Sequence, residues 1–83
     1  MPKILRRLLD HFEARRLLVV SIVSMNPGNP GMIADASCGV LNCVSAAFYL
    51  DRAEDFNLVT RDHRGYYYMT PHGSRYLAEH GVK

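Results

Sequence analysis

The sequence lacks any apolar run long enough to cross a membrane. Its longest run, LLVVSIV from Leu17 to Val23, is interrupted by a serine and falls well short of the roughly 20 residues that a bilayer requires. The first residues carry positive charges but no apolar segment followed by a small-residue cleavage site, so nothing indicates secretion. We therefore expect a cytoplasmic protein that has no membrane partner.

Cysteine is also scarce. Cys38 and Cys43 are the only two cysteines, and their spacing fits neither the C-x-x-C pair of a zinc site nor that of a redox dithiol. In a reducing cytosol, such cysteines are most often small buried hydrophobic residues. We predict that role for both, and we expect no metal site and no cofactor.

Catalytic patterns are missing as well. The histidines are spread along the chain without H-x-x-x-H spacing, and no carboxylate pair has a spacing that suggests acid-base catalysis. Ser45 has no nucleophile context, because G-x-S-x-G is absent. The sequence therefore does not indicate an enzyme.

Cations are nearly absent from the middle of the chain. Residues 17–60 contain one, Arg52, together with four acidic residues, Asp35, Asp51, Glu54 and Asp55. The net charge of +2 therefore comes from the two ends of the chain, where the remaining lysines and arginines lie. A nucleic-acid surface, if present, has to draw on those ends.

What the sequence does contain is the periodicity of one small, mostly helical α+β domain spanning residues 1–83. Residues 1–14 form an amphipathic helical extension, and after Arg15 and Arg16 the chain becomes apolar up to about Met25. Whether these make one helix or two remains open. The Pro- and Gly-rich stretch 26–31 predicts a loop.

After this loop, turn signals divide the chain into short elements. Residues 32–56 read as a helix ending near Gly39, a turn, and a helix from Cys43 with Asn42 as its N-cap. In that helix Ala46, Leu50, Ala53 and Phe56 mark the buried stripe. Residues 58–69 predict a β-hairpin around Gly65, and residues 70–81 a final helix that Thr70 caps.

The stretch from Ile33 to Gly81 resembles winged helix-turn-helix regulators of the PadR, MarR and ArsR kind. Such regulators often carry a pattern of the form GLV-x-R...G-x-Y-x-LT-x-x-G. Here DFNLVTRDHRGYYYMTPHG matches it at the positions Leu58, Val59, Arg61, Gly65, Tyr67, Met69, Thr70 and Gly73. The chain also resembles small winged-helix proteins of Mu-like bacteriophages.

This resemblance implies a DNA-binding transcriptional regulator of bacterial or phage origin. The third helix would enter the major groove of double-stranded DNA, and the hairpin, or wing, would lie on the backbone. On this basis, the candidate DNA-binding residues are Asn42, Ser45, Phe48, Tyr49, Arg52, Arg61, His63, Arg64, Tyr66 and Tyr68. A solvated turn with aromatic cross-strand packing is the alternative interpretation of the hairpin.

The third helix departs from the pattern expected of a base-reading helix. Phe48 stands where a polar or basic contact is expected, and Asp51 and Asp55 would face phosphates unfavourably. Phe48 could contact thymine methyl groups, or the helix register could differ by one residue. Alternatively, the helix could dock another protein, which would make the chain a protein interaction module on the same fold.

The N-terminal extension has two interpretations. Its apolar residues Leu5, Leu8, Leu9 and Phe12, together with Ile4, follow helical spacing. They could pack on their own domain or on the same residues of a second subunit. We favour a homodimer, because a two-fold interface needs only one self-complementary patch.

Overall fold

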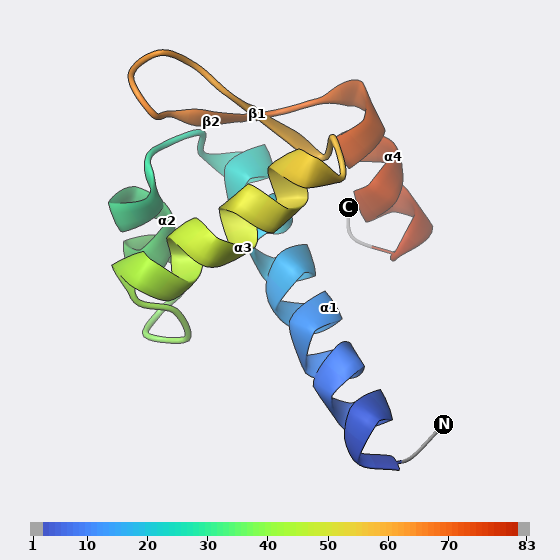
Figure 1. The fold of residues 1–83 in the computed structure, drawn as a ribbon. Helices are drawn as coiled ribbons and strands as arrows, with labels where there is room; N and C mark the ends of the chain where they lie inside the picture. Colours follow the sequence, from blue (N-terminus) through green and yellow to red (C-terminus); the bar gives the residue numbers. More distant parts are fainter. Residues whose placement is uncertain (1–2, 82–83) are drawn as a thin grey trace.

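In the part of the chain that the structure, a computed structural model, describes, the protein has four helices and one small sheet (Figure 1). The structure describes the backbone of residues 3–81 and the side chains of residues 11–81. In chain order, the elements are α1 (Lys3–Met25), α2 (Pro30–Ala36), α3 (Cys43–Asp55), β1 (Val59–Arg61), β2 (Tyr67–Met69) and α4 (Pro71–Glu79). The expected mostly helical α+β class is confirmed.

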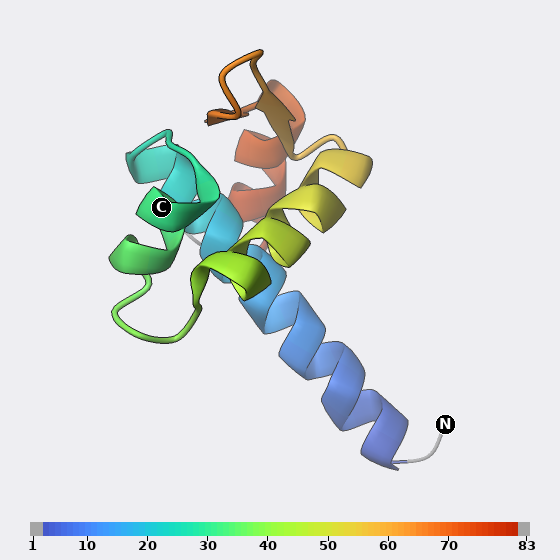
Figure 2. The same ribbon diagram turned by 60° about the vertical axis from the view of Figure 1, so that its left-hand side comes forward.

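The first helix is continuous, which answers the question that the sequence left open. Its C-terminal half lies at the centre of the molecule and buries Val19, Val20, Ile22 and Val23. Its N-terminal half runs outward, away from the other elements (Figures 1 and 2). No proline or glycine interrupts residues 3–25, so the helical hydrogen bonds extend through both halves.

Helix α2 is displaced from its predicted position. It begins at Pro30, because the Asn29 side chain caps it by accepting the N–H of Met32 at 2.9 Å. It ends at Ala36 rather than near Gly39, since Cys38 takes a left-handed φ of 55° and Gly39 one of 86°. Buried Ser37 then bonds both sides of the turn, donating to the Ala34 carbonyl at 2.6 Å and accepting the Leu41 N–H at 2.9 Å.

The burial predicted for both cysteines is wrong. Cys38 and Cys43 are exposed and unpaired. Cys38 occupies the left-handed turn after α2, and Cys43 is the first residue of α3, so neither position faces the core. The inward positions here are taken by Ser37 and Leu41.

The two strands form an antiparallel hairpin in which Val59 pairs with Met69 and Arg61 with Tyr67. Gly65 has a φ of 82°, as a tight loop requires. The loop between α1 and α2 adds to this sheet, since the Tyr67 N–H donates to the Gly28 carbonyl at 2.8 Å. The sequence did not predict this bridge.

Helix α4 packs closely on the base of the hairpin. The Thr70 hydroxyl caps it by accepting the Gly73 N–H at 2.9 Å, as predicted. Gly73 is buried, and a Cβ at this position would collide with the Leu58 carbonyl oxygen. This glycine is therefore required by a close approach of two backbones.

The buried side chains form one cluster to which α1, α2, α3, both strands and α4 contribute. Ala46, Leu50 and Ala53 of α3 belong to it, as predicted. Phe56 does not: it follows α3 as its C-cap and is 53% exposed. The left-handed Asn57, with φ 61°, then turns the chain, and Leu58 and Val59 take the inward positions instead.

Candidate nucleic-acid interface

The N-terminus of α3 is built as a capping box. The Asn42 Oδ1 accepts the Ser45 N–H at 2.8 Å, and the Ser45 Oγ accepts the Asn42 N–H at 3.0 Å. Two backbone groups that the helix leaves unpaired are thereby satisfied reciprocally. The Asn42 side-chain oxygen and the Ser45 hydroxyl are therefore engaged by the helix itself.

The middle of α3 presents one aromatic residue outward and one inward. Phe48 is 45% exposed, as predicted, and its ring meets the Tyr49 ring edge-on at 5.1 Å. The exposure predicted for Tyr49 is wrong, because only 8% of it is accessible. Tyr49 is adjacent to Ala46 and Ala53 on the helix surface, and α1 extends over this side, with the Phe12 ring 6.2 Å away.

The outermost surface of α3 is apolar and acidic. Val44 is 80% exposed, and Asp51, Asp55 and Arg52 are exposed beside it. The Arg52 guanidinium lies 5.3 Å from the centre of the Phe48 ring and 3.9 Å from the Asp55 carboxylate. This surface offers a single cation, already neighboured by a carboxylate, to the phosphates of DNA.

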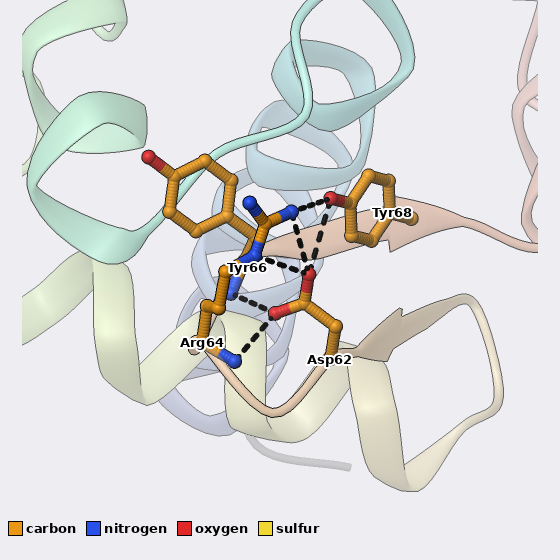
Figure 3. Close-up of polar contacts among 4 residues, drawn as sticks. All are labelled: Asp62, Arg64, Tyr66 and Tyr68. Carbon is orange, nitrogen blue, oxygen red and sulfur yellow. Dashed lines mark hydrogen bonds and ion pairs between the residues drawn. The ribbon is translucent and has the colours of Figure 1, made fainter.

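The hairpin tip, residues 62–65, is organised by Asp62 (Figure 3). Its Oδ1 accepts the backbone N–H groups of Arg64 at 2.9 Å and Tyr66 at 3.0 Å. Its Oδ2 accepts the Tyr68 hydroxyl at 3.1 Å and the Arg64 guanidinium at 3.2 Å. One carboxylate thus closes the turn and fixes two neighbouring side chains.

The electrostatics of the tip follow from these contacts. Desolvation alone would raise the pKa of the Asp62 carboxyl, but the hydrogen bonds from Tyr66, Arg64 and Tyr68 outweigh it and lower the pKa to about 2. In return, the Asp62 carboxylate raises the pKa of Arg64. Sequence reasoning missed Asp62, although an aspartate at the start of a glycine-containing turn is a known turn signal.

The basic and aromatic residues predicted for DNA binding meet in this hairpin. Arg61, His63 and Arg64 are exposed. The Arg61 guanidinium lies 3.9 Å from the Glu54 carboxylate of α3, which links the hairpin to that helix. Tyr66 and Tyr68 are half-buried rather than fully outward, because the Arg64 guanidinium covers the Tyr66 ring at 5.0 Å and the tip bonds the Tyr68 hydroxyl.

A second site, which the sequence did not predict, lies between α1 and α3. We define the aromatic groove as the hollow of about 240 Å³ lined by Phe12, Arg16, Phe48, Tyr49, Arg52 and Phe56. The Arg16 side chain is only 21% exposed. Its guanidinium lies 4.6 Å from the Phe56 ring centre and donates to the Tyr76 hydroxyl at 3.4 Å.

The predicted dimer residues fall largely outside this description. The side chains of Leu5, Leu8 and Leu9 lie outside the described residues, whereas Phe12 is 44% exposed at the edge of the aromatic groove.

Among the helices of residues 3–81, none is long and apolar enough to span a membrane.

Comparisons with protein-family models, with curated proteins and with solved structures found no match to this chain.

Proposed function

We propose that this chain is a winged helix-turn-helix protein that binds double-stranded DNA, as a small cytoplasmic transcriptional regulator of bacterial or phage origin. The order α2, turn, α3, hairpin, α4 agrees with that fold. The observation that carries the proposal is the hairpin beside α3, which exposes Arg61, His63 and Arg64 together.

In this proposal, the hairpin supplies most of the affinity. Arg61 and Arg64 contact phosphate oxygens, while His63 adds a third polar contact at the tip. Helix α3 offers few base-reading groups, because Asn42 and Ser45 are engaged in the capping box and Arg52 is its one cation. Binding is therefore dominated by phosphate contacts, with modest sequence preference.

A homodimer would place two hairpins on one duplex. Two-fold proteins bind half-sites about one helical turn apart, and doubling the phosphate contacts offsets the small number in each subunit. The extended N-terminal half of α1 is the element that we propose for this pairing.

The test is a salt titration of binding to duplex DNA. Replacing Arg61 or Arg64 by alanine should lower the slope of log affinity against log salt by about 1 for each, and weaken all sequences alike. The matched control is Arg75→Ala, which removes the same charge from an exposed position on α4. It should leave the slope unchanged. Equal slopes for all four proteins would overturn the role of the hairpin.

A second candidate function is protein docking through α3. It is favoured by the exposed surface of that helix, where Val44, Asp51 and Asp55 offer an apolar and acidic face that repels phosphate. The absence of DNA binding even at low salt would favour this function over the first.

A further inference from the structure

The aromatic groove combines several features of an incomplete interface. Phe12, Phe48 and Phe56 are 44%, 45% and 53% exposed, and they gather around one hollow instead of being scattered. Clustered exposed aromatic residues mark interaction sites, whereas isolated ones are ordinary. The two arginines at its edge, Arg16 and Arg52, belong to a residue type that is also enriched at interfaces.

The size of the groove narrows the choice of occupant. At about 240 Å³, it is smaller than the roughly 300–1,000 Å³ of typical small-molecule sites. It has room for one or two large apolar side chains, which is how anchor residues of a protein partner bind. A helix that carries apolar residues at three-and-four spacing would supply such anchors.

The chain itself contains a helix of this kind next to the groove. Phe12 and Arg16 line the groove from α1, and positions 5, 8 and 9 are in line with Phe12 along one helix face, since residues three and four apart are neighbours. All three positions are leucine. These positions belong to the half of α1 that extends away from the body (Figure 2).

We propose that the aromatic groove receives the N-terminal half of α1 from a second copy of this chain. Leu5, Leu8 and Leu9 of each copy lie against Phe12, Phe48 and Phe56 of the other, with the two α1 helices antiparallel. This arrangement is closed and two-fold, because each copy gives one leucine segment and receives one. It rests on the proposed homodimer but not on DNA binding.

Two residues of α3 take another role in this dimer. Phe48 and Arg52, which were predicted to contact DNA, become interface residues, whereas the hairpin with Arg61 and Arg64 lies outside the groove. The presence of a phenylalanine on a helix expected to read bases then has a physical reason. Phe48 covers apolar surface between subunits rather than facing a duplex.

The first test measures the dimer dissociation constant of the full chain by sedimentation equilibrium. Phe48→Asp and Leu8→Asp each place a charge in the contact, and each should raise the dissociation constant about 30-fold or more, as loss of a hot spot does. Val44→Asp is the matched control on α3, since Val44 is 80% exposed and outside the groove. Its dissociation constant should equal that of the unmodified chain.

The second test separates this contact from a leucine-on-leucine pairing and from misfolding. Phe48→Asp keeps an intact leucine segment and Leu8→Asp an intact groove, so an equimolar mixture should form a heterodimer more readily than either variant dimerises alone. Circular dichroism first establishes that each variant is folded. A mixture that stays as monomeric as its components, or an unmodified chain that is monomeric at all accessible concentrations, would overturn the proposal.

Discussion

The hairpin tip and the aromatic groove lie on either side of α3 and differ in how their side chains are satisfied. At the tip, Asp62 bonds Arg64, Tyr68 and two backbone N–H groups, so the polar groups find partners within the chain. At the groove, three phenylalanine rings stay about half exposed. The tip is complete in one copy of the chain, whereas the groove has apolar surface left to bury.

This difference bears on both proposals. Arg64 is already bonded to the Asp62 carboxylate. To contact a phosphate, its guanidinium has to divide its donors between the two anions or break the bond to Asp62, and either change reduces what Arg64 can contribute to DNA affinity. The Phe48 and Phe56 rings already face Arg52 and Arg16, but covering their exposed apolar surface breaks no hydrogen bond and is therefore favourable. Binding at the tip therefore exchanges contacts, while binding at the groove adds them.

The largest expected effect comes from detaching the hairpin from the body. Tyr67 is 2% exposed, and its backbone pairs with Gly28 and Arg61. We expect Tyr67→Ala to lower the free energy of unfolding by about 3 kcal/mol, because it empties a large aromatic site in the core. Urea denaturation measures this value.

Tyr66→Ala is the matched control for that experiment. Tyr66 is half-buried beside the tip, and its loss should cost less than about 1 kcal/mol. Equal losses for the two variants would mean that Tyr67 does not anchor the hairpin.

A smaller effect is expected at Arg16, which lines the aromatic groove. Arg16 stacks on the Phe56 ring and bonds the Tyr76 hydroxyl, and so joins α1 to the end of α3 and to α4. We expect Arg16→Ala to lower the free energy of unfolding by about 1 kcal/mol through lost cation–π contact and packing. Thermal unfolding at protein concentrations below the dimer dissociation constant separates this effect from association.

Arg15→Ala removes the same charge one position earlier on α1. Its expected cost is within about 0.5 kcal/mol, as for most surface substitutions. A loss at Arg15 as large as that at Arg16 would show that charge, rather than stacking, is responsible.

The smallest effect is a pH dependence confined to the tip. The folded pKa of Asp62, about 2, lies below its ordinary value of 3.8. The carboxylate contacts therefore stabilise the tip fully above about pH 4, and this stabilisation is lost as pH falls through 2. The Tyr68 hydroxyl donates to this carboxylate, so the NMR signals of the Tyr68 ring should report the protonation of Asp62, with a midpoint near pH 2 in the folded protein.

Asp62→Asn supplies the reference for that titration. It removes the ionisable group, so the Tyr68 signals should no longer change between pH 4 and 2. A midpoint near 3.8 in the unmodified chain would contradict the hydrogen-bonded geometry of the tip.

The features that the sequence predicted correctly are local ones. The caps at Asn42 and Thr70 and the hairpin turn at Gly65 each depend on a residue and its near neighbours. Such preferences act between residues that are close in the chain, so they can be predicted from the sequence alone.

The errors arise where distant elements meet. Burial of Tyr49 depends on α1 passing over α3, and exposure of Phe56 depends on the chain turning at Asn57 before the ring reaches the core. The aromatic groove joins residues 12 and 16 to residues 48–56. Periodicity within one helix predicts an inward side but not which neighbour covers its edges, so the groove could not be predicted.

The bridge between Gly28 and Tyr67 has a practical consequence for engineering the chain. By composition, the stretch 26–29 is the obvious place to insert a tag or a reporter, yet its backbone is hydrogen-bonded to β2 and Asn29 caps α2. An insertion there would separate the hairpin from the helices that it rests on.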